Sequence, residues 1–164
     1  MSELIVDPVH GVRYTFEEEG NELIVDTLMD PGGGLPKHYH PAQEEIWWVV
    51  SGEVRFHLDG EWLTLTPESG KVTVPPGTVH GLENESATET HLRAEVNPPL
   101  DLKSFLTDSA AAAREGLFMK GGIPRSLRGA KWAAQFLERY EDQVVMTFPP
   151  RFAQKLMRPL ARIG

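Results

Sequence analysis

Residues 32–52, which read GGGLPKHYHPAQEEIWWVVSG, decide how the rest of the chain is interpreted. Successive side chains of a β-strand point to opposite faces, so His38 and His40 share a face, with Cα atoms roughly 6.6 Å apart. Two imidazoles placed in this way can bind one cation, and imidazole and carboxylate are common ligands of first-row transition metals. His38, His40 and either Glu44 or Glu45 therefore form a candidate partial metal site that needs a further ligand.

The length and composition favour one globular domain, or one domain with an appendage. The chain has 164 residues, enough for a single sizeable core. It contains no cysteine, which excludes disulfides, zinc–thiolate sites and thiol catalysis. The first residues lack the basic start and long apolar core of a signal peptide, and no apolar run approaches the roughly 20 residues of a membrane span. We therefore expect a cytoplasmic protein.

Charge is distributed unevenly along the chain. Residues 1–100 carry 18 acidic against 5 basic side chains, whereas residues 120–164 carry 3 against 9. The acidic part would repel nucleic acid, so we expect no nucleic-acid partner. The basic part can pair with acidic groups of its own chain or of a second subunit, or it can contact an anionic surface. We favour pairing within the chain or between subunits, because segments of one chain meet at high effective concentration.

Short apolar segments separated by turn residues follow one another through the first hundred residues. Asp59-Gly60 is a strong two-residue hairpin signal, and Pro75-Pro76-Gly77 suits a type II turn. The acidic segment 17–22 is expected to be a solvated turn. Eight or nine strands at this spacing predict an all-β sandwich or small barrel. Besides the histidine strand, the predicted strands cover residues 9–16, 23–28, 45–50, 54–58, 61–65, 71–74, 79–82 and 88–96.

The sequence changes character at Pro98-Pro99. Residues 102–119 are rich in helix formers and end at Gly121-Gly122, while residues 124–140 and 150–163 show helical spacing of apolar side chains. Pro159 should kink or shorten the last helix. We therefore predict a β domain at residues 1–99 and a helical C-terminal extension at residues 100–164, packed on the barrel or on a partner subunit.

His80, in the segment PPGTVHGLEN, is the best candidate for the missing ligand. A Pro-Gly turn just before a histidine strand holds the backbone rigidly, and a rigid ligand loses less entropy when it binds metal. The choice between Glu44 and Glu45 stays open at this point, because each shares its strand face with apolar residues.

Two spaced motifs resemble those of the cupin superfamily. The first has a histidine pair, a glutamate five residues later and a glycine seven residues after that, and it opens with a glycine six residues before the first histidine. The second has a Pro-x-Gly turn followed by a histidine and an asparagine. Here Gly70 lies one residue closer to Pro75 than is usual, and Lys71 stands where an acidic residue is common. The matching residues are Gly32, His38, His40, Glu45, Gly52, Pro75, Gly77, His80 and Asn84.

This resemblance, which spans roughly residues 9–97, implies a double-stranded β-helix, or jelly-roll, barrel. It also selects Glu45 over Glu44 and implies one divalent transition metal inside the barrel, which could be Fe, Mn, Ni, Zn or Cu. The implied metal ligands are His38, His40, Glu45 and His80.

Several other residues have weaker claims to a role. We expect Trp47 to line the pocket or to be a core residue, and Trp48 to lie on the reverse face, where it could join a sheet–sheet or dimer contact. Arg93 and Tyr14 are candidate substrate-orienting groups, but we favour a surface arginine and a core tyrosine. We interpret His10, His57 and His91 as solvated or structural, with His57 facing outward, and Asn84 as a structural residue near its turn.

Three imidazoles and one carboxylate leave coordination positions open, which favours an enzyme acting on a small molecule. Cupins with this ligand set resemble dioxygenases, so we expect a metal-dependent, dioxygenase-like oxidoreductase in which Glu45 is both ligand and proton acceptor. The alternatives are a non-redox isomerase, lyase or cyclase at the same metal, and a non-catalytic binding module with a structural metal. A surface role of the basic C-terminal helix at a partner or membrane rests only on its spacing. We expect a homodimer, and no membrane partner.

Overall fold

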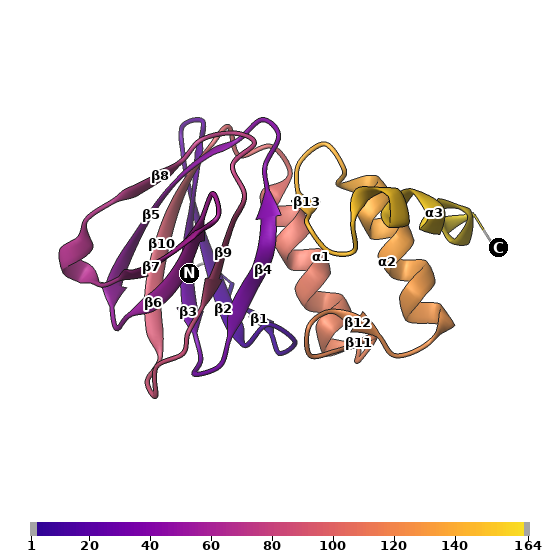
Figure 1. The fold of residues 1–164 in the computed structure, drawn as a ribbon, viewed down its shortest axis with the longest axis horizontal. Coiled ribbons are helices and arrows are strands. Elements are labelled where there is room, and N and C mark those ends of the chain that lie inside the picture. The colour runs from indigo at the N-terminus through magenta and orange to yellow at the C-terminus, as the bar shows by residue number, and fades with distance from the viewer. Residues whose placement is uncertain (1–2, 163–164) are drawn as a thin grey trace.

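The computed structural model describes residues 3–162, and in these residues two antiparallel sheets face each other to form the barrel (Figure 1). One sheet has the strand order β1-β2-β3-β10-β5-β8, and the other has the order β13-β4-β9-β6-β7. This arrangement is the predicted double-stranded β-helix. The strands of the two sheets are β1 Ile5–Asp7, β2 Val12–Glu19, β3 Glu22–Met29, β4 Gly34–Tyr39, β5 Glu44–Ser51, β6 Val54–Leu58, β7 Glu61–Leu65, β8 Val72–Val74, β9 His80–Glu83, β10 Thr90–Asn97 and β13 Val145–Met146.

Alternating apolar residues hold the two sheets together. In β2, Val12, Tyr14 and Phe16 point into the barrel, and their neighbours along the strand face outward. Phe56 from β6 and Leu82 from β9 are fully buried at the centre. Burying such side chains stabilises the fold by about 1.5–3 kcal/mol each, which explains why the period of two along each strand fixes its register.

The predicted solvated turn at residues 17–22 is wrong in extent. The strand β2 continues to Glu19 and β3 begins at Glu22, so the turn is only Gly20 and Asn21. Gly20 has a positive φ of 60°, which a tight hairpin turn needs and glycine adopts without strain. The acidic side chains of this segment stand exposed at the end of the hairpin, where solvent can hydrate them.

The helical extension differs from the prediction mainly between residues 115 and 126. Helix α1, Leu102–Arg114, ends at a turn in which Gly116 has a φ of 71°, and a small hairpin of β11, Phe118–Met119, and β12, Ile123–Pro124, follows. Helix α2 is Leu127–Arg139 and helix α3 is Arg151–Ala161; a short 3₁₀ turn, η1 Pro67–Ser69, lies in the barrel. Pro159 sits inside the last turns of α3, and Ile163 lies outside the described residues.

The extension lies at one end of the barrel, with α1 next to the sheets and α2 and α3 farther out (Figure 1). Its strand β13 joins the barrel, because Val145 and Met146 pair with Tyr39 and His38 of β4. Neither β13 nor β1 was predicted, since each is too short to show alternation.

The helices of the extension pack through aromatic rings and ion pairs. The rings of Phe105 and Phe136 lie 4.8 Å apart, and the Tyr140 hydroxyl donates to Asp108 Oδ2 at 2.6 Å. Three basic groups of residues 120–162 form ion pairs, and their acidic partners are Asp108, Glu115 and Glu141. These ion pairs therefore form within the chain, as favoured, but they join residues of the extension to one another and not to the acidic first hundred residues. No helix among residues 3–162 is long and apolar enough to cross a membrane.

Candidate metal centre

The barrel brings the four predicted ligands together from three strands and one loop. His38 lies on β4 and is the cross-strand partner of His80 on β9, with ring centroids 4.3 Å apart. His40 follows the end of β4, and Glu45 lies on β5. The three histidines place ligand nitrogens within 4.8 Å of one another, a spacing that one ion can bridge after small rotations of the rings.

Each of the three imidazoles is oriented by a backbone carbonyl. The Nδ1 atoms of His38, His40 and His80 lie 2.7, 2.9 and 3.0 Å from the carbonyl oxygens of Pro36, Gln143 and Thr78. A carbonyl oxygen can only accept, so Nδ1 carries the hydrogen and Nε2 presents a lone pair. This is the tautomer that a histidine ligand needs, and the carbonyls fix both the tautomer and the orientation of each ring.

Glu45 completes the cluster from the opposite side. Its Oε1 lies 3.2 Å from His40 Nε2, and its Oε2 lies 2.8 Å from His80 Nε2. The indole N–H of Trp47 donates to Oε2 at 2.9 Å, which holds the carboxylate in place. Glu45 is buried, whereas Glu44 is exposed, so only Glu45 faces the histidines.

The donor set fits a metal ion on physical grounds. The Nε2 atoms of His40 and His80 are buried, and the Glu45 carboxylate lies next to them at 3.2 and 2.8 Å. Each faces the Glu45 carboxylate, which also offers only lone pairs, so the arrangement requires a positive charge between the donors. A cation with affinity for imidazole and carboxylate meets that requirement without leaving a buried polar group unsatisfied.

The pKa shifts mostly favour the protonation states that bind metal. Burial, followed by the neighbouring His80 and His40, lowers the pKa of His38 well below its usual value, so this ring stays neutral. Burial raises the pKa of Glu45, but the charges and hydrogen bonds of His40 and His80 outweigh burial and hold that pKa well below its usual value. For His40, the nearby Glu45 outweighs burial and raises the pKa, so a proton competes with metal at this ring.

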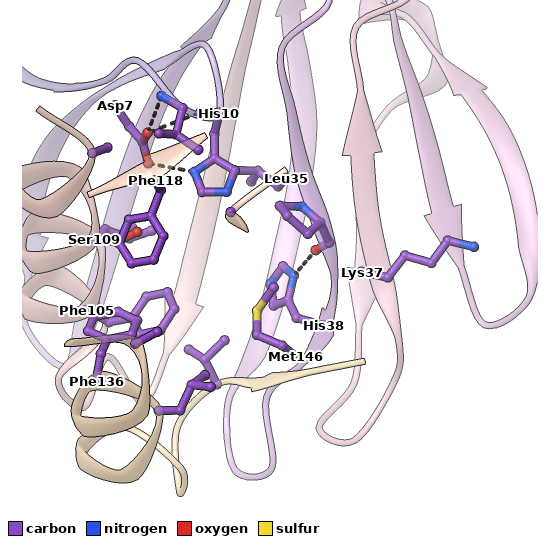
Figure 2. Close-up of a pocket in the computed structure, with 18 of the residues that line it drawn as sticks. Asp7, His10, Leu35, Lys37, His38, Phe105, Ser109, Phe118, Phe136 and Met146 are labelled. Carbon is purple, nitrogen blue, oxygen red and sulfur yellow. Dashed lines mark hydrogen bonds and ion pairs between the residues drawn. The ribbon is translucent and has the colours of Figure 1, made fainter. Parts of the chain in front are cut away.

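A cavity of about 610 Å³ opens directly from this cluster (Figure 2). Its wall includes His38, His40 and Glu45 of the cluster. Trp47 and Tyr14 also line it, and this position was predicted for Trp47. The opposite wall comes from the extension and is strongly aromatic, and Figure 2 shows Phe105 and Phe136 on that side, across from His38. The aromatic residues of the extension that line the cavity are Phe105, Phe118, Trp132, Phe136 and Phe148.

Two of the residues with weaker claims to a role, Arg93 and Trp48, lie on the outer face of the barrel. Arg93 is not among the residues that line the cavity: it forms ion pairs with Glu17 and Asp26 on the outer face, so it is the surface arginine that we favoured and not a substrate-orienting group. Trp48 lies on that outer face, between the cations of Lys71 and Arg93. Parity along the strands explains both positions, since these residues alternate with the inward-facing ones.

The predictions for the remaining polar residues have mixed outcomes. His57 was expected to be solvated or structural; it is only 5% exposed, because the ring of Trp62 covers it with centroids 5.1 Å apart, so it is not solvated. His91 is paired with Asp26 on the outside of the barrel, as a structural residue would be. Asn84 is structural as predicted: its amide donates to the carbonyls of Met29 and Thr88.

Sequence reasoning missed two parts of the site. The carbonyl of Gln143 orients His40 across 103 positions of the chain, and a backbone carbonyl carries no residue-type signal. The pair of Asp7 and His10 also lines the cavity, with Asp7 Oδ2 2.7 Å from His10 Nδ1. The sequence DPVH at residues 7–10 weakly indicates a turn that the Asp7–His10 pair stabilises. It does not indicate that the turn lies beside the histidine and glutamate cluster.

A family comparison agrees with this geometry. Residues 25–95, which include all four predicted ligands, match the family described as the cupin domain. Residues 25–95 therefore form a cupin domain. The match ends before the helical extension, so the extension and its aromatic wall lie outside the part that the family defines.

Among curated proteins, this cupin is similar to an oxidoreductase of Arthrobotrys oligospora, with 37% identity over 47% of this chain, and to polyketide synthase CurC of Streptomyces cyaneus, with 32% identity over 43% of this chain. The matched parts make up 31% and 46% of those relatives, so the chain spans less than half of either protein.

Solved structures share the fold. KdgF from Halomonas sp. has a TM-score of 0.52 at 23% identity, covering 57% of this chain and 84% of that one. An RmlC-like cupin from Shewanella frigidimarina has a TM-score of 0.55 at 23% identity, covering 62% and 88%. At this identity the similarity establishes the architecture of the barrel and not the activity.

Proposed function

We propose that this cupin is a metal-dependent enzyme that carries out a dioxygenase-like oxidation of a small, largely apolar organic molecule. The observation that carries the proposal is the position of the histidine and glutamate cluster in the wall of an aromatic cavity. A purely structural ion would be enclosed by protein ligands, whereas this cluster has one side that faces open space.

The metal in this proposal is one divalent transition metal, such as Fe, Mn, Ni, Zn or Cu. When bound, such an ion supplies Lewis-acid activation and, if it is redox-active, electron exchange with dioxygen. Glu45, restrained by the Trp47 indole, is both a ligand and a proton acceptor in the proposal. The residues that would hold the ion are His38, His40, Glu45 and His80.

The cavity supports an apolar, aromatic or enolic substrate. Its volume of about 610 Å³ is within the range of small-molecule sites, and most of its lining side chains are apolar. Aromatic rings such as Phe136 and Trp132 can stack on a planar substrate and exclude water from the metal end.

A second candidate is non-redox chemistry at the same metal, such as isomerisation or cyclisation of a polyketide-like molecule. Two observations favour it: one relative is named polyketide synthase CurC, and an Asp–His pair lies in the same cavity. A non-catalytic small-ligand-binding module with a structural metal is less well supported, because the cluster opens on the cavity whereas a structural ion is enclosed by protein ligands.

Oxygen consumption distinguishes the two enzymatic candidates. Protein purified without added metal is analysed for metal content and then given a panel of enolic and catecholic compounds in an oxygen electrode. We expect oxygen uptake that depends on both protein and compound. Product formation without oxygen uptake would favour the non-redox candidate, and binding without turnover of any compound would favour the binding module.

We also propose a homodimer. Phe148, Phe152 and Leu156 of the extension are at least 69% exposed, and a second copy of the chain would cover such side chains. Sedimentation equilibrium is expected to give twice the chain mass, and Phe152→Ser is expected to weaken association. If the protein is a monomer that binds anionic lipid vesicles at low salt, the basic helix α3 has the surface role instead.

A further inference from the structure

The Asp7–His10 pair is built into the cavity wall, with Asp7 at the end of β1 and His10 on the loop between β1 and β2. Asp7 is almost completely buried, with 3% of its side chain exposed, while His10 keeps 20% of its side chain exposed. Both residues line the cavity. Figure 2 shows the pair beside the space that His38 also faces, with Phe105 and Phe136 across from them. A buried carboxylate that supports a partly exposed imidazole is the arrangement of a proton-transfer pair.

Hydrogen bonds fix the tautomer of His10. Asp7 Oδ1 accepts from the backbone N–H groups of Val9 and His10, at 3.0 and 3.1 Å, and Oδ2 is 2.7 Å from His10 Nδ1. The carboxylate can only accept, so Nδ1 donates and Nε2 is left with a lone pair. No residue in the described part of the chain forms a hydrogen bond with His10 Nε2, which leaves this nitrogen available to a ligand.

The backbone around His10 is held rigidly. The His10 carbonyl accepts from Gly34 N–H at 2.9 Å, and the Gly11 carbonyl accepts from Asp30 N–H at 2.9 Å. Gly33 packs so closely on this loop that a Cβ there would lie 2.6 Å from the Gly11 oxygen. The loop is therefore attached to the start of β4, the strand that carries His38, and the two sites keep a fixed spacing.

The charge of Asp7 is also maintained. Burial raises the pKa of the Asp7 carboxyl, but its hydrogen bond and charge interaction with His10 outweigh burial and leave the pKa below its usual value. An ionised Asp7 can stabilise the imidazolium that forms when His10 takes up a proton.

We propose that Asp7 and His10 are a second catalytic element of the cavity, in which His10 Nε2 takes a proton from a substrate carbon next to a carbonyl group or from an enolic hydroxyl. The C–H or O–H electron pair stays on the substrate as an enolate, and the proton moves to His10. His10 then returns the proton to another atom of the product or to water, so the step needs no oxidant. The inference rests on the proposed function and identifies its substrate class as carbon acids with an aromatic or apolar body.

The test uses hydrogen–deuterium exchange at C2 of 1-phenyl-1,3-butanedione, a carbon acid with an aromatic ring, followed by NMR in D₂O. We expect the wild-type protein to accelerate exchange over buffer. His10→Gln removes the base, and Asp7→Asn retains the acceptor for Val9 and His10 N–H groups but donates to His10 Nδ1, which reverses the tautomer. Each change should slow the catalysed exchange by about 100-fold or more, with unchanged metal content and with the protein still folded at the assay temperature.

His91 provides a matched control, because it is paired with Asp26 at 2.6 Å on the outer face of the barrel. His91→Gln should leave exchange within about twofold of the wild type. Two results would overturn the inference: exchange in both His10→Gln and Asp7→Asn within threefold of the wild type, or a wild-type rate no faster than buffer.

A readout that does not depend on activity comes from ¹⁵N NMR of the histidine side chains. The wild type should show His10 with its hydrogen on Nδ1, and Asp7→Asn should move it to Nε2. A wild-type hydrogen on Nε2 would contradict the proposal even if the variants unfold. If His80→Ala abolishes metal binding while the His10 and Asp7 variants behave as wild type, this inference fails and the proposed metal enzyme stands.

Discussion

The barrel and the helical extension contribute different properties to one site. The barrel holds the metal cluster on hydrogen-bonded strands around a buried core, with Phe56 and Leu82 fully enclosed. The extension forms the aromatic wall of the cavity, and several of its apolar side chains, such as Leu127 and Phe152, are exposed. The geometry of the histidines and Glu45 therefore belongs to the tightly packed barrel, while the shape of the opposite cavity wall belongs to the extension.

Two contacts join these regions at the site itself. Met146 of β13 pairs with His38, and the carbonyl of Gln143 orients His40. The extension therefore orients the histidine and glutamate cluster as well as covering it, so movement of the segment between α2 and β13 would change both the cluster and the cavity wall.

The largest expected effect is in the barrel. His80→Ala removes a fully buried imidazole from the deepest point of the cluster. We expect loss of stoichiometric metal and a fall in activity of about 1,000-fold, because a catalytic ion is worth several kcal/mol in the transition state. Metal analysis and steady-state rates check this, with His91→Ala as the control on the outer face. Full metal content in His80→Ala would show that His80 is not a ligand.

Truncating an apolar side chain should cost more stability in the barrel core than on the exposed surface of the extension. Phe56→Ala in the barrel core is expected to lower the free energy of unfolding by about 3–5 kcal/mol. Leu127→Ala at the start of α2, where the side chain is 74% exposed, should change it by less than about 0.5 kcal/mol. Urea denaturation of both variants measures this difference. A cost for Leu127→Ala as large as that for Phe56→Ala would mean that a partner surface buries this part of the extension.

Ligand binding should be sensitive to the aromatic wall that the extension contributes. Phe136→Leu keeps an apolar side chain at the cavity wall but removes the ring, so the Kd for an aromatic ligand should rise by about 5–10-fold, near 1 kcal/mol. Metal content should not change. Isothermal titration with 1-phenyl-1,3-butanedione measures the effect, and Phe152→Leu, which alters an exposed ring, is the control. Equal losses in both variants would contradict a role for the cavity wall.

The smallest expected effect concerns acid stability. The pKa of Asp7 is lower in the folded state than its usual value of 3.8, so this group stabilises the fold above that value, and the contribution is lost as the pH falls through the folded pKa. The destabilisation caused by Asp7→Asn should therefore be larger at about pH 6 than at about pH 3. Urea unfolding at the two pH values checks the sign. A destabilisation that is constant or grows on acidification would contradict it.

Most of the barrel, and the convergence of its three histidines with Glu45, could be predicted from the sequence, because their signals are local. Alternation along β2, β3 and β10 and the Asp59-Gly60 hairpin set the strands, and the spacing of His38, His40 and His80 survives folding because rigid turns precede or follow each one. Parity alone did not separate Glu44 from Glu45; burial in the folded barrel does.

The rest could not be predicted because it depends on contacts between distant segments. His57 faces outward as its parity requires, yet the ring of Trp62 on the neighbouring strand covers it. The cavity wall needs α1 and α2 to pack against the barrel, and helical periodicity gives no information about which end of the barrel they cover. The pairing of Asp7 with His10 is local, but its place in the cavity follows from the closure of the sheets.

The most direct test of the central claim is X-ray absorption spectroscopy on protein purified without added metal, combined with elemental analysis of the same sample. The account predicts about one divalent transition metal per chain, with an edge and scattering pattern that fit three imidazole ligands, one carboxylate and at least one oxygen from solvent. Absence of a transition metal at stoichiometric level, or a first shell without imidazole, would contradict the account.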